Sequence, residues 1–220
     1  MMIRGGRLVA TAVVAACLGA VLSACAPVVL GGAAMSVLVA TDRRTSGAQL
    51  EDEGIQLRAA GRIRESVGDR VHVNITSYNR QVLLTGEVPS AQDKQLVEQI
   101  VSRVENVRSI VNELAVMPIT PITQRSNDTF ITGKMRASLL DAKDLTASAF
   151  KVVTERGVIY LMGIVSQREA ARATSIARGV TGVRKVVRVF EYVSDDDLAR
   201  LNAPARAPVT DTNPEPAPAK

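Results

Sequence analysis

The chain has 220 residues, with 27 basic and 22 acidic side chains, and its formal net charge is +5. A charge of this size does not by itself indicate nucleic-acid binding. Aromatic residues make up only 3% of the chain and tryptophan is absent, so any core must be built from valine, isoleucine, leucine and alanine. The length allows one or two small domains.

The first 24 residues have the layout of a secretory signal peptide. A basic start carries Arg4 and Arg7, an uncharged apolar run covers residues 8–21, and small residues precede Cys25. The run is shorter than the roughly 20 residues that a transmembrane helix needs. Leu22-Ser-Ala-Cys25 resembles the lipobox of bacterial lipoproteins, in which the cysteine is acylated and becomes the new N-terminus. The alternative is an ordinary signal peptide followed by an incidental cysteine.

Cleavage before Cys25 changes both the charge and the thiol content. It removes Cys17, Arg4 and Arg7, so the mature chain keeps 25 basic and 22 acidic residues, a net charge of +3. With Cys25 alkylated, no free thiol remains, which suits an oxidising compartment. Several acyl chains together hold a protein durably to a bilayer. Ala26 stands where lipoproteins kept in the inner membrane typically carry aspartate, so we expect an outer-membrane protein on the periplasmic face.

The rest of the chain contains an internal repeat with a spacing of about 76 residues. Val82-Leu-Leu-Thr-Gly86 aligns with Ile159-Tyr-Leu-Met-Gly163, and residues 104–111 align with 180–187. We therefore predict two copies of one small domain. The predicted segments are a signal peptide at 1–24, a membrane-proximal linker at 25–46, domains at 47–117 and 125–194, and a disordered Pro/Ala-rich tail at 202–220.

Each copy is predicted to follow the order α-β-β-α-β. The first helices are expected at 50–67 and 128–140, hairpin turns at Asn79-Arg80 and Glu155-Arg-Gly157, and final strands at 107–116 and 183–193. Capping boxes at Ser90-x-x-Asp93 and Ser166-x-x-Glu169 should begin the second helices. The fold class is therefore α+β, with two tandem domains, each a mixed three-stranded sheet covered by two helices.

Residues that could carry chemistry are few. His72 is the single histidine and lies on the polar side of a predicted strand, where a solvated role is expected. Gly86 and Gly163 stand in no glycine-rich phosphate motif, so they indicate room at a strand end. Asp195-Asp-Asp197 lacks the spacing of a calcium loop and is expected to cap a short final helix. We predict no enzyme, no metal site and no cofactor.

The helix that opens the second copy is the informative segment. At about 100° per residue, Ile131, Met135 and Leu139 share the face expected to cover the sheet. The opposite face is also apolar and has basic margins, although a helix on a two-layer domain needs only one apolar face. The residues of this outer face are Phe130, Gly133, Lys134, Arg136, Ala137 and Leu140. The matching face in the first copy, with Leu57, Arg58, Gly61, Arg64 and Glu65, is expected to be ordinary solvated surface.

Three occupants could cover the second apolar face. An apolar wedge flanked by cations suits an anionic bilayer, where apolar burial and charge attraction add. The alternatives are packing against the first domain and binding of a protein partner.

The repeated Leu-x-Gly-x-Val-x-Ser unit, followed by Val-x-Gly-Val-x-x-Val, resembles the BON domain. Two such domains behind a lipobox resemble the two-BON outer-membrane lipoproteins, over nearly all of residues 25–194. The resemblance implies binding of anionic phospholipid, such as phosphatidylglycerol or cardiolipin, through the second domain. It also implies a role in envelope integrity at the division site, and no nucleic-acid partner. A periplasmic adaptor or chaperone for envelope proteins, such as outer-membrane assembly factors, is the competing hypothesis.

Overall fold

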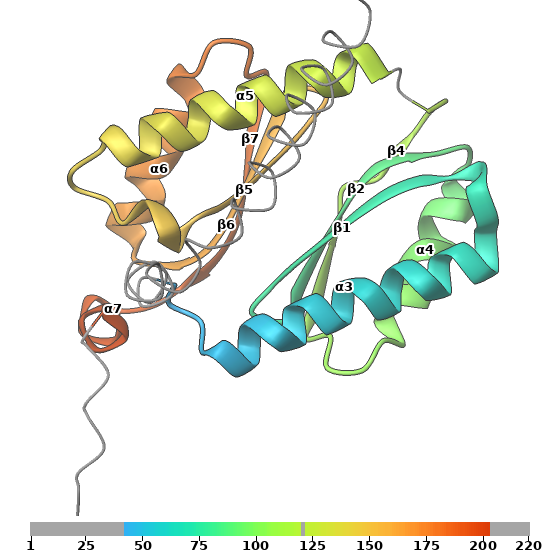
Figure 1. Ribbon diagram of the computed structural model, residues 1–220, viewed down its shortest axis with the longest axis horizontal. Coiled ribbons are helices and arrows are strands. Elements are labelled where there is room, and N and C mark those ends of the chain that lie inside the picture. The colour runs from blue at the N-terminus through green and yellow to red at the C-terminus, as the bar shows by residue number, and fades with distance from the viewer. Residues whose placement is uncertain (1–41, 120–121, 203–220) are drawn as a thin grey trace, which may run out of the picture. The chain divides into compact units, whose positions relative to one another are not determined.

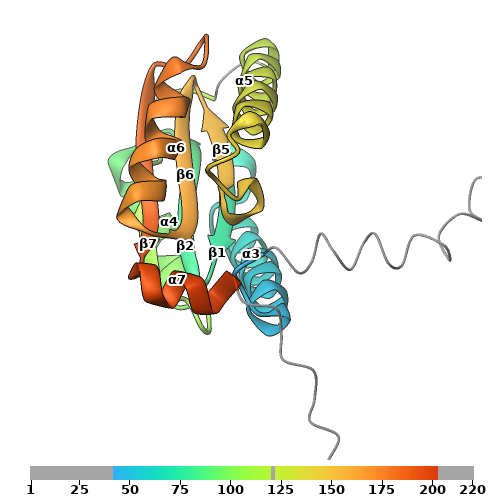
Figure 2. The ribbon, with the colours of Figure 1, turned by 90° about the vertical axis from the view of Figure 1, so that its left-hand side faces the viewer.

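The computed structural model describes residues 42–119 and 122–202, and in the second range the side chains from residue 125 onward (Figure 1). The first copy of the repeat consists of α3 (Ser46–Val67), a 3-10 turn (Gly68–Arg70), β1 (His72–Tyr78), β2 (Gln81–Val88), α4 (Ala91–Ser102), β3 (Ser109–Asn112) and β4 (Ala115–Val116). The second consists of α5 (Ile122–Asp141), a 3-10 turn (Ala147–Ala149), β5 (Lys151–Glu155), β6 (Val158–Val165), α6 (Gln167–Gly179) and β7 (Lys185–Tyr192). The short helix α7 (Asp195–Asn202) follows β7 (Figure 2). The predicted α+β class and the order α-β-β-α-β are confirmed.

Both first helices begin earlier than the apolar pattern predicted. The Thr45 side chain accepts the backbone N–H of Ala48, so α3 begins at Ser46. The described side chains of α5 that precede Asp128 are exposed or half-buried, so the early part of that helix carries no core pattern. Hydrophobic periodicity reports the part of a helix that faces the core, not the residue at which it begins.

The second helices are capped by the predicted serines, but only one full capping box forms. Ser166 accepts the backbone N–H of Glu169, and the Glu169 carboxylate accepts the backbone N–H of Ser166. Ser90 likewise accepts the N–H of Asp93, but the shorter Asp93 side chain accepts the Ser90 hydroxyl instead. At the final helix, it is Ser194 that accepts the N–H of Asp197, which corrects the expected aspartate cap.

Each sheet is mixed, with its longest apolar strand in the centre. β2 pairs antiparallel with β1 and parallel with β3 and β4, whereas β6 pairs antiparallel with β5 and parallel with β7. The predicted strand at 107–116 is therefore broken into β3 and β4. The Asn112 side chain accepts the backbone N–H of Leu114 at this break, and Leu114 is buried in the helix-covered core. Figure 1 shows the helices of each copy on one face of its own sheet.

The face of each sheet without helices is also buried. Because side chains alternate along a strand, Val82 and Leu84 of β2 pack under α3 and α4 while Leu83 points to the other face. The second faces of both sheets meet in one apolar cluster, whose buried members are Tyr78, Leu83, Tyr160, Met162, Ile164 and Val189. Burial raises the pKa of Tyr78 and of Tyr160 to about 12. The two domains thus contact each other through their sheets.

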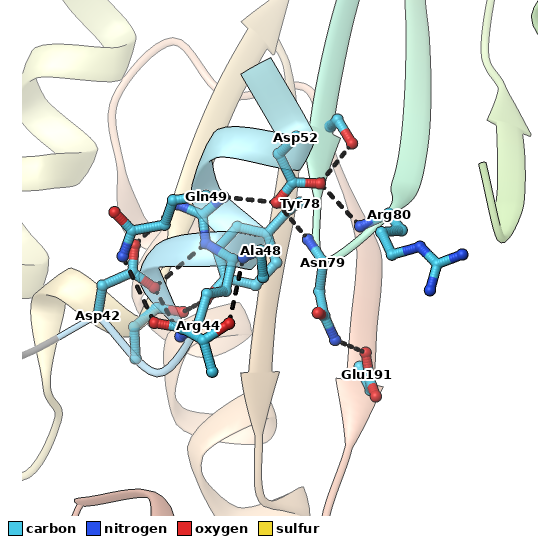
Figure 3. A network of polar contacts seen from close by, with 12 residues as sticks. Asp42, Arg44, Ala48, Gln49, Asp52, Tyr78, Asn79, Arg80 and Glu191 are labelled. Carbon is cyan, nitrogen blue, oxygen red and sulfur yellow. Dashed lines mark hydrogen bonds and ion pairs between the residues drawn. The ribbon is translucent and has the colours of Figure 1, made fainter. Parts of the chain in front are cut away.

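A buried aspartate on each first helix holds the hairpin turn of its own domain. Asp128 of α5 accepts the backbone N–H groups of Arg156 and Gly157, both at 2.7 Å. Those turn residues have φ values of 51° and 71°, which suit a two-residue hairpin loop. Asp52 of α3 does the same for the first hairpin (Figure 3). The position of α5 on its sheet is therefore fixed by a polar clamp as well as by its apolar face.

The segment that enters α3 is tied to both domains through two consecutive arginines. Arg44 contacts the first domain: its Nη1 lies 2.8 Å from Asp52 Oδ2, and its guanidinium carbon lies 4.3 Å from the Tyr78 ring centroid (Figure 3). Arg43 contacts the second domain by donating to both Glu169 carboxylate oxygens at 2.8 Å and to the Ile164 carbonyl oxygen. Only 1% of the Arg43 side chain and 5% of the Glu169 side chain are exposed. This segment follows the residues expected to link the domains to the lipid anchor.

Candidate phospholipid-binding surface

The two faces of α5 have the burial that its sequence predicted. On the inner face Ile131, Met135 and Leu139 are buried in the core of the second domain. On the outer face Phe130 is 63% exposed and Leu140 is 74% exposed. The apolar side chains of this outer face therefore carry no cover from the first domain. One of the three expected alternatives was packing of this face on the first domain. The structure shows a different contact, because the two domains pack together through their sheets.

The small residues of this surface leave it open. Gly133 and Ala137 are both exposed, and a Cβ added at Gly133 would meet no atom within 4 Å. The two large apolar side chains therefore stand above a low helix surface, at its two ends. An apolar shape of this kind can insert to a shallow depth without burying the helix backbone.

Two cations border the apolar side chains. The Nζ atom of Lys134 lies 4.4 Å from the centroid of the Phe130 ring, and Arg136 is exposed on the other margin. Within the described ranges neither cation forms an ion pair with a carboxylate. The Lys134 ammonium therefore lies over the face of the Phe130 ring, the arrangement of a cation–π contact. The surface thus presents apolar groups and uncompensated positive charge together.

The matching surface of α3 is exposed, as expected, but it is not free of large apolar side chains. Leu50 and Leu57 are 70% and 75% exposed, so the first domain also has exposed apolar side chains. The difference between the helices lies in charge. Arg58 of α3 pairs with Glu51, and exposed Glu53 and Glu65 add negative charge. In contrast, the first of the two acidic residues of α5, Asp128, is buried in the turn clamp, which leaves Asp141 as its exposed acid.

His72 also differs from the prediction. Its Nδ1 lies 3.0 Å from a carboxylate oxygen of Glu87, which is fully buried and also accepts from Arg156 at 2.8 Å. His72 therefore takes part in a polar contact between the domains. Among the described residues no group of histidine, cysteine and acidic side chains is arranged to hold a metal ion. None of the described helices has the length and apolar character needed to cross a bilayer.

Cys25 and the tail beyond residue 202 lie outside the described residues. The aspartate clamps were missed, although their signal was present, since Asp52 and Asp128 occupy the same place in the repeat. The Glu87–Arg156 contact carried no such signal, because its partners come from different copies. The predicted roles of Gly86 and Gly163 fit their surroundings: a Cβ there would lie 2.1 Å and 2.5 Å from a backbone oxygen of the neighbouring chain segment.

Comparisons with known proteins agree with the repeat. The family model described as "BON domain" matches residues 52–118 and again residues 127–194. The chain is 35% identical to the outer membrane lipoprotein DolP of Haemophilus influenzae over 78% of its own length and 90% of that protein. It is 32% identical to a 21 kDa hemolysin of Actinobacillus pleuropneumoniae, over 69% of its length and 79% of that protein. It is 31% identical to the osmotically-inducible protein Y of Escherichia coli, over 52% of its length and 58% of that protein.

Proposed function

The chain belongs to the BON-domain family, and we propose that it is an outer-membrane lipoprotein that binds anionic phospholipid through α5 of its second BON domain. Acylation of Cys25 would anchor the chain with its domains on the periplasmic side. The similarity to a lipoprotein over 90% of that protein's length supports the anchoring. The proposal includes a contribution to envelope integrity at the division site and contains no catalytic step.

The observation that carries the lipid-binding proposal is the combination of exposed apolar and cationic groups on α5. Burying an aromatic side chain such as Phe130 is worth roughly 1.5–3 kcal/mol. Each basic residue near an anionic surface adds about 1 kcal/mol, which Lys134 and Arg136 could both supply. The apolar part is insensitive to salt, whereas the electrostatic part weakens as ionic strength rises.

Vesicle binding by the mature chain with Cys25→Ser, which lacks acyl chains, tests the proposal. We expect binding to phosphatidylglycerol or cardiolipin vesicles and little binding to phosphatidylcholine vesicles. Phe130→Glu should abolish binding and leave the fold intact, because the ring is mostly exposed. Lys134→Glu should weaken binding mainly at low salt.

Leu57→Glu is the matched control, because Leu57 is 75% exposed on the corresponding helix of the first domain. It places the same new charge on the chain and should leave vesicle binding unchanged. Undiminished binding by a folded Phe130→Glu protein would contradict the proposal and favour the protein-adaptor alternative. In cells, the same Phe130→Glu variant should fail to restore detergent resistance to a deletion strain.

A further inference from the structure

A cavity of about 300 Å³ lies in the second domain, between the C-terminal half of α5 and the strand β5. Its inner wall is formed by Leu139, Phe150 and Val152, which belong to the core of the domain. Leu140 and Ala147 complete the apolar lining. Among the residues that the structure describes, no acidic side chain lines this space. The cavity therefore offers apolar surface that is open to the outside and continuous with the core.

Two cations are among the residues that line this cavity. Arg136 comes from α5 and Lys151 from β5, and both are exposed. In the part of the chain that the structure describes, neither forms an ion pair. Apolar lining together with two unpaired cations matches a ligand with one apolar chain and an anionic head group, since each part meets its complement.

The corresponding groove of the first domain also has apolar lining, but its charged residues differ. It measures about 190 Å³ and is lined by Arg64, Asp69 and His72 among other residues. In the repeat alignment Arg64 stands where the second domain has Leu140, so a charged side chain replaces an apolar one. Asp69 adds a negative charge that would repel an anionic head group. Of these two spaces, that of the second domain combines apolar lining and two cations without an acidic side chain among the described residues.

We propose that this cavity takes one acyl chain of an anionic phospholipid from the bilayer, with the lipid phosphate between Arg136 and Lys151. The inference rests on the proposed lipid-binding function and specifies how one lipid molecule is held there. Leu140 connects the two, because it belongs both to the exposed outer face of α5 and to the cavity lining. A helix surface lying on the bilayer would therefore have an opening for a single chain at its edge.

The test uses monomeric lysophosphatidylglycerol, below its micelle-forming concentration, with the mature chain carrying Cys25→Ser. We expect saturable one-to-one binding by titration calorimetry, with NMR shift changes at the cavity residues. Lysophosphatidylcholine, which has a zwitterionic head group, should bind at least tenfold more weakly. Ala147→Phe, which fills the cavity, should reduce the affinity at least tenfold.

Lys151→Glu is the second variant, because an exposed side chain can be changed without loss of the fold. It should also reduce lysophosphatidylglycerol affinity at least tenfold, and if Ala147→Phe unfolds the protein, this result decides. The matched surface control is Lys143→Glu, which makes the same charge change at an exposed position outside the cavity and should leave the affinity unchanged.

The outcomes separate this inference from the proposed function. Phe130→Glu should lose vesicle binding and keep lysophosphatidylglycerol binding, because Phe130 does not line the cavity. Vesicle binding by the wild-type chain without saturable binding of the monomeric lipid would contradict the acyl-chain site and leave the proposed function intact. Unchanged affinity of the folded Lys151→Glu protein for lysophosphatidylglycerol would also contradict the acyl-chain site. Monomer binding without vesicle binding would instead contradict the role of the outer face.

Discussion

Arg43→Ala should destabilise the protein far more than the loss of an exposed ion pair in the second domain, where the partner of Arg43 lies. Arg43 makes a two-point contact with Glu169, and both side chains are almost fully buried. Removing one partner of a buried pair costs about 3–5 kcal/mol, because the other charge stays buried without compensation. Glu169 would still accept the backbone N–H of Ser166 at 3.2 Å. We therefore expect a loss near the lower end of this range.

Urea unfolding followed by circular dichroism measures this effect in the mature chain with Cys25→Ser. The matched control is Arg172→Ala, which breaks an ion pair with Asp144 whose side chains are 49% and 44% exposed. Exposed pairs contribute about 0–1 kcal/mol, so this variant should unfold nearly as the wild type does. In a Glu169→Ala background, Arg43→Ala should cost at least about 1 kcal/mol less than it does alone.

Equal destabilisation by Arg43→Ala and Arg172→Ala would refute the reasoning. It would mean that residues 42–44 are not seated between the domains in solution. The tether to the lipid anchor would then leave the first domain without being fixed to the second.

The following outcomes are also expected. Burial alone would raise the pKa of Glu169, but the hydrogen bond from Arg43 lowers it below 4.5, and the hydrogen bond from Arg108 lowers the pKa of Glu191. A carboxylate whose pKa is lowered by folding adds stability above its unfolded pKa. The free energy of unfolding should therefore fall as the pH drops below about 4.5, and this fall should be smaller in Arg43→Ala. Gly86→Ala should lower the free energy of unfolding by about 1–3 kcal/mol or more, because φ is 115° and the new Cβ would lie 2.1 Å from a backbone oxygen. Gly61 has open space around it, so Gly61→Ala should instead stabilise α3 by up to about 1 kcal/mol in the same urea assay. Cys25→Ser should release the protein from membrane fractions, and an unmodified mass for the wild-type chain would contradict anchoring. Limited proteolysis should cut near residues 118–123 and after Leu201 before it cuts inside either repeat.

The sequence by itself determined the local features of this protein. Alternating and helical apolar patterns gave the element types, because burial on one face imposes the period of the element on the sequence. The repeat gave two domains of one fold, and the inner and outer faces of α5 followed from the spacing of Ile131, Met135 and Phe130. These features depend on residues close together in the chain, so the pattern of one segment is sufficient to predict them.

Only the tertiary structure decided which surfaces meet. The strand β6 is apolar on both faces, whereas the second face of β2 carries Leu83 between polar residues. Neither sequence can say that this second face packs on the other domain's sheet. The Arg43–Glu169 and Glu87–Arg156 contacts join residues far apart in the chain, and each would look like an ordinary surface charge in its own segment. The same holds for the cavity, because Leu140 and Phe150 have a shared wall only after α5 has packed on β5. Long-range contacts depend on how faces come together, and that information is spread over the whole chain.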